Sequence, residues 1–249
     1  MDLTITASLD SAMTTINGSA MTGAMTVTQD AAANIAVTGG SGNDLIDLGG
    51  DNFDANDTVN GGAGTDTLSI EEDDAIALTT AAAELTKISN VEIINLTDTL
   101  AGNVTLSFFG AATTLELSAG IDANDRTLTM ISGDTIDLEA DAGDDITIVA
   151  SGSGTSDIIN LILNNADVAA NIQAATVETL NITTTGIADA GVNTITGTTT
   201  LNAIAGTQSI VINGGEALTF TGVITADNVD GSTMTDVLTI SAGTSAAAT

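Results

Sequence analysis

The sequence predicts an all-β chain that folds as a right-handed parallel β-solenoid, or β-roll, with short Ala-rich helical or turn segments. Two nonapeptides, at residues 39–47 and 61–69, fit the pattern Gly-Gly-x-Gly-x-Asp-x-(large apolar)-x. A strand pattern that begins at Asp recurs along the chain, and a longer degenerate repeat is superimposed on it. Turns that each open a short strand, coil after coil, are typical of a solenoid.

The composition allows a buried core of an unusual kind. The chain has 249 residues, of which 43% are hydrophobic, and a mean hydropathy of +0.34. These values argue against intrinsic disorder, the alternative that the acidity of the chain raises. Aromatic residues make up only 2% of the chain, so the core must be aliphatic, with stacked rungs of Ile, Leu and Val. The length allows one large or two ordinary domains.

The charge balance excludes several partners. The chain carries 33 Asp and Glu against 2 Lys and Arg, a formal net charge of −31. Such a charge argues against nucleic acid and against insertion into or binding to an anionic membrane. It also makes the compact state repel itself, and bound divalent cations would relieve that repulsion.

The N-terminus lacks the features of a secretory signal peptide. Residues 1–8 contain neither a basic region nor a long apolar run, and no window approaches the ~18 apolar residues of a membrane helix. We expect either an internal piece of a longer protein or export without an N-terminal signal. The chain has no Cys, which excludes disulfides and thiolate metal sites, but calcium can stabilise a secreted protein in their place.

The two nonapeptides predict turns built for a hard cation. Their glycines let the backbone adopt positive φ and direct several carbonyl oxygens at one point, which the Asp closes with a carboxylate. Oxygen ligands on a flexible turn suit Ca²⁺, which takes six to eight of them. The fold class therefore includes stabilisation by calcium.

The segments on either side of the first nonapeptide are read separately. Residues 1–38 contain three β-prone stretches and form a predicted N-terminal β segment, a candidate strand for assembly. Residues 39–249 form the predicted calcium-binding solenoid. Residues 49–57 form an acidic insertion, interpreted either as a loop with extra oxygen ligands, at Asp51, Asp54 and Asp57, or as a solvated loop.

The second half of the nonapeptide can be followed along the whole chain. The pattern Asp-x-Φ-x-Φ, in which Φ is aliphatic and the intervening residues are mostly polar, is typical of half-buried strands with inward aliphatic side chains. It begins at Asp44, Asp66, Asp134, Asp144, Asp157 and Asp236.

A longer repeat lies over these strands. Residues 91–97 (VEIINLT) match residues 177–183 (VETLNIT) at an offset of 177 − 91 = 86 residues. Each copy follows an Ala-rich segment, at 78–85 and 166–172, for which we expect a short helix or a turn. The repeats are therefore degenerate units of roughly 80–90 residues, and the third is cut short after Asp236.

With the nonapeptides and the Val-Glu strands in place, the chain resembles the calcium-dependent surface-layer (S-layer) proteins of Gram-negative bacteria, in the wider RTX group. The resemblance covers roughly residues 37–249. It implies type I secretion by an uncleaved C-terminal signal, folding outside the cell on Ca²⁺, and assembly into a lattice on the cell surface. The chain departs from the family in having two intact nonapeptides and no clear secretion signal in residues 241–249.

The resemblance also implies a ligand set. Asp side chains and Gly carbonyls of the two nonapeptides would hold Ca²⁺, and further Asp residues are weaker candidates, because an Asp also stabilises a turn through its own backbone. The candidate ligands are Gly40, Gly42, Asp44, Asp47, Asp57, Gly62, Gly64, Asp66, Asp134, Asp144, Asp157 and Asp236. The partners to expect are further copies of the chain and a cell-surface polysaccharide.

Two pairs of polar residues share the Val-Glu strands. Glu92 and Glu178 have the parity of the inward aliphatic residues, so a cation or backbone N–H groups must meet their carboxylates unless they lie in water at the strand mouth. Of these alternatives, the position in water at the strand mouth is slightly favoured. Asn95 and Asn181 are candidates for a ladder of side-chain amides.

The residue inventory argues against an enzyme. Without His or Cys, only carboxylates and hydroxyls are left for catalysis. A glycosidase usually presents aromatic side chains to its sugar, and this chain has only four Phe in all. Phosphate binding by the Gly-rich turns is excluded because no Lys or Arg accompanies them. We expect an extracellular structural protein that self-assembles. The alternatives are a repeat of a large secreted adhesin and a subunit of a filament that exchanges strands.

Overall fold

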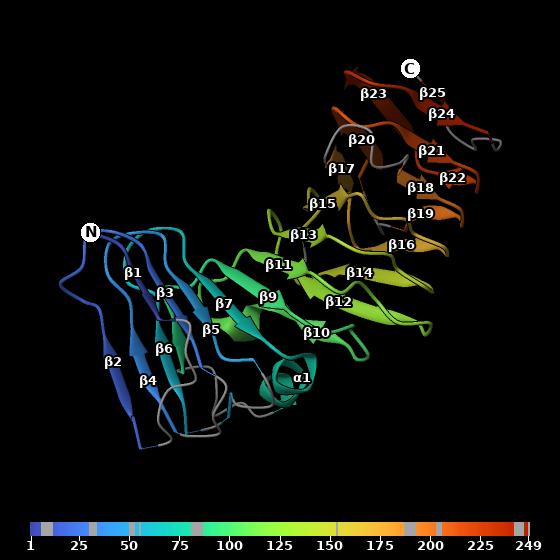
Figure 1. Cartoon of the computed structure of the whole chain (residues 1–249). Coiled ribbons are helices and arrows are strands. Elements are labelled where there is room, and N and C mark those ends of the chain that lie inside the picture. The colour runs from blue at the N-terminus through green and yellow to red at the C-terminus, as the bar shows by residue number, and fades with distance from the viewer. Residues whose placement is uncertain are drawn as a thin grey trace. The chain divides into compact units, whose positions relative to one another are not determined.

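The computed structural model is built almost entirely of parallel β-strands wound as a solenoid (Figure 1). The residues form two compact units, one of Met1–Asp98 with Val104–Glu116 and one of Thr99–Asn103 with Leu117–Thr249, called units 1 and 2 below. The described residues are 1–5, 12–29, 34–49, 53–54, 56–80, 87–152, 154–186, 193–202, 206–241 and 247–248.

In unit 1, successive strands alternate between two sheets, so that neighbours within a sheet are one coil apart. The first sheet has the order β1 (Leu3–Ile5), β3 (Met25–Thr28), β5 (Leu45–Asp47), β7 (Thr67–Ile70), β9 (Ile93–Leu96) and β11 (Thr114–Leu117). The second has the order β2 (Thr15–Asn17), β4 (Ala36–Thr38), β6 (Thr58–Asn60) and β8 (Ile88–Ser89). Unit 1 also contains β10 (Val104–Thr105) and the 3₁₀-helix η2 (Leu106–Phe109).

Unit 2 has three faces. The first sheet has the order β13 (Thr135–Leu138), β15 (Ile158–Asn164), β17 (Thr179–Thr185), β20 (Ser209–Gly214), β23 (Asn228–Met234) and β25 (Ala247–Ala248). The second has the order β12 (Arg126–Met130), β14 (Ile146–Ala150), β16 (Ile172–Ala175), β19 (Thr199–Asn202) and β22 (Ile224–Thr225). The third has the order β18 (Asn193–Ile195), β21 (Leu218–Phe220) and β24 (Leu238–Ile240), and isolated parallel bridges through Ile121, Ala142 and Val168 lead up to it.

The core consists mainly of aliphatic side chains stacked coil on coil, as the sequence predicts, but Phe53, Phe109 and Phe220 are fully buried as well. In unit 1 Ile46 pairs in register with Leu68, which pairs with Ile94, and all three side chains are fully buried. In unit 2 Leu180 lies between Ile159 and Ile210 in the same way. The inward residues after five of the six predicted Asp positions are buried, and those after Asp236 are half-buried. Parallel pairing in register places like side chains above one another.

One coil is shorter than the repeat found in the sequence. The paired residues Leu45 and Thr67 are 67 − 45 = 22 positions apart, and Thr179 and Ser209 are 209 − 179 = 30 positions apart. The 86-residue offset therefore spans several coils. The longer coil from Thr179 to Ser209 carries the additional strand β18, yet its first-sheet strands stay in register.

The helix α1 (Glu72–Thr80) overlaps the first Ala-rich segment, of which residues 81–85 lie outside the described part. Acidic residues occupy its first turn, where their negative charges interact favourably with the positive end of the helix dipole. The Asp98 carboxylate accepts the N–H of Glu72 (2.6 Å), and Ala75 and Leu78 are buried. The second Ala-rich segment is not helical: it contains a bridge at Val168 and then enters β16.

The N-terminal segment is continuous with the sheets of unit 1. β3 pairs with β5, and β4 pairs with β6, both in parallel. The division of the chain at residue 38 and the use of this segment in assembly stay predictions. Among the described residues, no helix has the length and apolarity to cross a membrane.

The core prediction can be checked by two substitutions on one strand. In β15 the Leu161 side chain is fully buried, whereas the next residue, Ile162, points outward and is partly exposed. We expect Leu161→Ala to lower the free energy of unfolding by about 2–5 kcal/mol, because it leaves a cavity in the stack. Ile162→Ala serves as the control and should lower it much less. Urea unfolding at constant calcium measures both, and equal losses would contradict the inward assignment of Leu161.

Candidate functional site

The glycine-rich corners of unit 1 stack directly on each other. The N–H of Ala63 donates to the carbonyl of Gly40 (2.9 Å). Gly62 and Gly64 have φ of +106° and +135°, and a Cβ on either would overlap the carbonyl oxygen of Gly40 or Gly42. These positions need glycine for conformation and for close approach. The predicted carbonyl ligands of the first corner thus face the second corner.

The first glycine of each motif lies against the carboxylate that closes its own corner. A Cβ on Gly39 would overlap Oδ2 of Asp44 and the carbonyl oxygen of Gly61. A Cβ on Gly61 would overlap the carbonyl oxygen of Asn90 and lie 2.6 Å from Oδ2 of Asp66. In both corners a carboxylate oxygen and a carbonyl oxygen of the next coil therefore lie where a Cβ on the first glycine would have to be.

The acidic side chains of successive corners form a column linked by backbone amides. The N–H of Met25 donates to Oδ1 of Asp44 (2.7 Å), the N–H of Asp44 donates to Oδ1 of Asp66 (2.7 Å), and the N–H of Asp66 donates to Oε2 of Glu92 (2.9 Å). The second oxygen of Asp44 accepts the N–H of Gly40 (2.7 Å). Each carboxylate thus satisfies the amide at the start of a strand one coil earlier, as a helix cap does for a helix.

Asp66 is the member of this column with spare ligand capacity. Its side chain is 1% exposed, and Oδ2 is buried without a hydrogen-bond partner among the described residues. Burial, followed by the charges of Asp44 and Glu92, raises the pKa of Asp66. A buried carboxylate oxygen without a donor is unfavourable. The corner therefore offers one unpaired anionic oxygen beside the Asn90 carbonyl.

The Val-Glu repeat has the same role in both units. Oε2 of Glu178 accepts the N–H of Asp157 (2.8 Å), as Oε2 of Glu92 accepts that of Asp66. Glu178 is only 5% exposed and Glu92 is half-buried. The favoured alternative, that water solvates these carboxylates at the strand mouth, is wrong for Glu178, because Glu178 is buried and its carboxylate accepts a backbone N–H.

Two more of the predicted ligands are buried and bonded to backbone amides. Asp57 is 1% exposed and accepts the N–H groups of Ile35 (2.6 Å) and Asp54 (2.7 Å). Asp134 is 5% exposed, and its Oδ2 accepts the N–H of Ile131 (2.6 Å). Burial raises the pKa of both carboxyls, and the amide bonds oppose this rise. The structure thus gives each of them a corner-stabilising role.

The other predicted ligands lie nearer the surface. Asp47, Asp144 and Asp236 accept an amide N–H from one or two residues further on, at 3.2, 2.9 and 2.7 Å. Asp157 is half-buried, and Asp236 is exposed. For Asp47, the observed contact is the local turn bond that the sequence allows as the alternative to metal binding, whereas Asp144 and Asp236 accept the N–H of the residue that directly follows them.

The acidic insertion is described in part. Residues 50–52 and 55 lie outside the described part, so the prediction for Asp51 is not tested. Asp54 is exposed, and its Oδ1 accepts the N–H of Asn56 (2.6 Å).

Folding creates one acidic group that the sequence patterns missed. Within the described residues, Asp125, Asp144 and Asp145 are the one set of three possible metal ligands with oxygens within 4.8 Å of one another. Of these only Asp144 is predicted from sequence. Arg126 pairs in register with Ile146, and this pairing brings Asp125 beside Asp145. No motif in the sequence marks Asp125, because its first inward aliphatic residue, Leu128, lies three positions after it and not two as in the Asp-x-Φ-x-Φ pattern.

Side-chain amides link neighbouring coils on the outer surface. Nδ2 of Asn181 donates to Oδ1 of Asn160 (2.9 Å), and Nδ2 of Asn160 donates to the carbonyl of Gly133 (3.0 Å). Asn95 donates to Oγ of Ser69 (3.4 Å) instead. The predicted amide ladder exists for Asn181, with the preceding coil as its partner.

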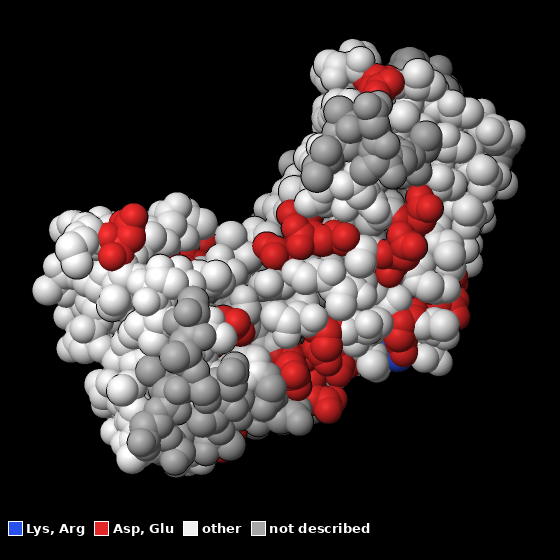
Figure 2. Space-filling view, in the orientation of Figure 1, with Lys and Arg blue, Asp and Glu red and all other residues white. Residues whose placement is uncertain are grey.

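Negative charge is spread over the surface in separate patches. Figure 2 shows Asp and Glu as red groups on the visible face, with almost no blue. Arg126 forms an ion pair with a nearby carboxylate. Its Nη2 lies 2.6 Å from Oδ2 of Asp122, and this bond lowers the pKa of Asp122. Among the described residues there is thus little positive charge to offset the acidic corners.

Asp137 is a further carboxylate that has a buried oxygen without a hydrogen-bond donor among the described residues. It lies on β13, and the buried oxygen is its Oδ1. Burial and the nearby charge of Glu139 raise the pKa of Asp137 to about 6.

Comparison of the chain with protein-family models, with curated proteins and with solved structures found no match. The resemblance to RTX surface-layer proteins therefore stays a prediction that depends on the nonapeptides and the Val-Glu strands alone.

The packing of the corner predicts a specific effect of Gly61→Ala. The added Cβ would overlap the Asn90 carbonyl and crowd the Asp66 carboxylate, so we expect a loss of about 1–3 kcal/mol in the free energy of unfolding. Gly215→Ala is the matched control, because its Cβ would meet only Oγ1 of Thr235, at 3.7 Å. Thermal unfolding by circular dichroism measures both, and equal stability of the two variants would show that the corner is not close-packed.

The raised pKa of Asp137 predicts a pH effect of definite sign. The folded state binds this proton more tightly than the unfolded state, so the destabilisation by Asp137 is complete above pH 6 and is relieved as the pH falls from about 6 to 4. Asp137→Asn should raise stability at pH 7.5 and remove this part of the pH dependence. Urea unfolding between pH 4 and 7.5 tests this, with the exposed Asp236→Asn as control. An unchanged pH profile for Asp137→Asn would contradict it.

Proposed function

We propose that this chain is a structural protein that acts outside the cell, folds when it binds Ca²⁺, and self-assembles into a surface layer or lattice. Its proposed role is mechanical, not enzymatic. The proposal combines the parallel solenoid of the structure with the glycine corners, the acidity and the family resemblance of the sequence.

The observation that carries the proposal is the buried, unpaired Oδ2 of Asp66. It lies in a column with two other carboxylates, and the amide donors of the column do not reach it. The residues fit a hard cation in part: Asp66 and the carbonyl of Asn90 can supply oxygen ligands, whereas both oxygens of Asp44 already accept N–H groups. A bound Ca²⁺ would supply positive charge to this corner and offset its carboxylates.

The net charge suggests how calcium would control folding. At −31 the chain repels itself when compact, so low calcium favours the unfolded, exportable state. In high calcium, an ion that binds only the folded corners stabilises them by mass action, by about 2.7 kcal/mol for one site at 100 times its Kd.

The open ends of the sheets suggest how copies would join. β1 is the first strand in the order of unit 1, and β25 is the last in that of unit 2. An edge strand presents N–H and C=O groups that a neighbouring copy can pair with. Solenoid coils from two copies would then continue the same parallel ladder.

Calcium removal and the variant Asp66→Asn test the folding step together. We expect chelator to reduce the strand signal in circular dichroism and to lower the melting temperature, and calcium to restore both. Asp66→Asn removes the unpaired anionic oxygen, so it should melt higher than the wild type in chelator and gain less on calcium addition. Asp73→Asn, at an exposed position of α1, should respond to calcium as the wild type does.

If calcium leaves the melting temperature of the wild type unchanged, the proposal that calcium binding drives folding is wrong. Assembly is tested separately, by electron microscopy and light scattering of the purified chain at millimolar calcium. Sheets or lattices are expected. Monomers at high concentration would overturn the lattice and favour an adhesin repeat.

A further inference from the structure

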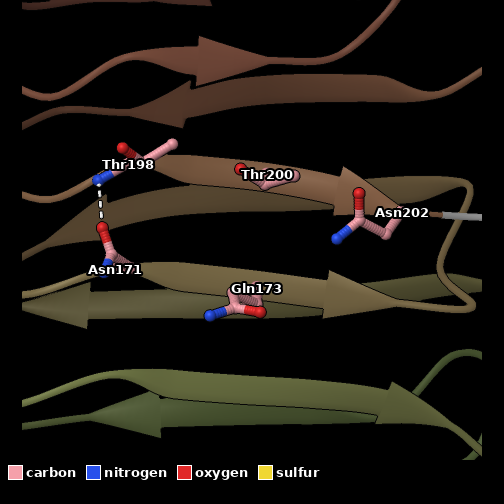
Figure 3. Close-up of a pocket in the computed structure, with 5 residues that line it drawn as sticks. All are labelled: Asn171, Gln173, Thr198, Thr200 and Asn202. Carbon is pink, nitrogen blue, oxygen red and sulfur yellow. Dashed lines mark hydrogen bonds between the residues drawn. The ribbon is translucent and has the colours of Figure 1, made fainter.

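Unit 2 carries a polar hollow on the outer face of its second sheet. The hollow has a volume of about 280 Å³ and lies over β16 and β19 (Figure 3). Its lining consists of amide and hydroxyl side chains: Asn171, Gln173, Thr198, Thr200 and Asn202.

Strand pairing and side-chain parity explain why these groups gather. Gln173 pairs with Thr200 in register, and Ala175 pairs with Asn202. The alternate residues of both strands, such as Ile172 and Leu201, are buried in the core, so the polar residues must point outward. The small Ala175 opposite Asn202 leaves the space between the amides open.

One of the lining side chains is held rigidly by its neighbours. The N–H and Nδ2 of Asn171 donate to the carboxylate of Asp145 (2.8 and 2.9 Å), and its Oδ1 accepts the N–H of Thr198 (2.7 Å). Figure 3 shows the last of these bonds at the edge of the hollow. One wall of the hollow is therefore pre-formed, which lowers the entropy lost when a ligand binds.

Three other lining groups are available to a ligand. The side chains of Gln173, Thr200 and Asn202 make no hydrogen bond to another residue in the described part of the chain, and each can both donate and accept. The lining contains no charged residue, and in a chain of net charge −31 an anion would be repelled. A cation would find no carboxylate among the lining groups.

We infer that this hollow binds one sugar unit of an uncharged saccharide. Sugar hydroxyls both donate and accept hydrogen bonds, as the three free side chains do, and the volume suits a single ring. Because no aromatic ring lines the hollow, a single unit should bind weakly, and a polymer that engages several copies of the chain should bind more tightly. The inference goes beyond the proposed function and does not depend on calcium as a ligand.

Affinity electrophoresis of the whole chain, in calcium, tests the inference. The gels contain a neutral polysaccharide (dextran, mannan or galactan) or an anionic one (alginate or polygalacturonate). We expect at least one neutral polymer to retard the chain and the anionic polymers to leave its mobility unchanged. Gln173→Met and Thr200→Val keep the side-chain shape but remove the hydrogen-bonding groups. Each should weaken binding about 2- to 10-fold, the effect of one uncharged hydrogen bond.

Thr183→Val is the matched control, because Thr183 lies on β17, in the first sheet of unit 2, and should bind as the wild type does. Circular dichroism verifies that all variants fold. Lack of retardation in every neutral polymer, equal retardation in the anionic ones, or full binding by Gln173→Met and Thr200→Val would overturn the inference. If these two variants instead abolish self-association, the face is an interface between copies of the chain.

Discussion

The structure depends on the requirement that each coil satisfy the polar groups of the coil before it. Parallel strands in register pair most backbone groups, but the corners leave amides at the start of each strand. Carboxylates from the next coil meet these amides, at Asp44, Asp66 and Glu92 in unit 1 and at Glu178 in unit 2. Because an unmet buried amide is unfavourable, the acidic residues contribute to the backbone architecture as well as to the net charge.

The same arrangement creates an electrostatic problem. The column in unit 1 places three carboxylates in succession, and the amides supply only partial charges against them. Asp66 shows the result, with one buried oxygen unpaired and a raised pKa. Under the proposed function, cations would offset these carboxylates and stabilise the corners. This is the physical basis for proposing calcium as the trigger of folding.

Two of the three outer faces of unit 2 differ in a way that bears on binding. On the first sheet, Asn181 and Asn160 use their amides on each other, which links coils and leaves less for a ligand. On the second sheet, Gln173 and Thr200 point outward without such bonds, next to an Asn171 that is already fixed. Outward polar residues whose neighbours in register can hydrogen-bond to them therefore link adjacent coils. Those without such neighbours are left to bind a ligand.

The sequence by itself determined the all-β class, the parallel solenoid and the inward aliphatic residues, because period-2 alternation and glycine corners act locally. It identified Asp44, Asp66 and Glu178 as residues with special roles. Only the tertiary structure decided which partners they meet, since the amide that Glu178 accepts belongs to a residue 21 positions away. Asp125 and Asp145, and the hollow between β16 and β19, escaped prediction for the same reason. Register between coils of unequal length brings them together, and no local pattern encodes that register.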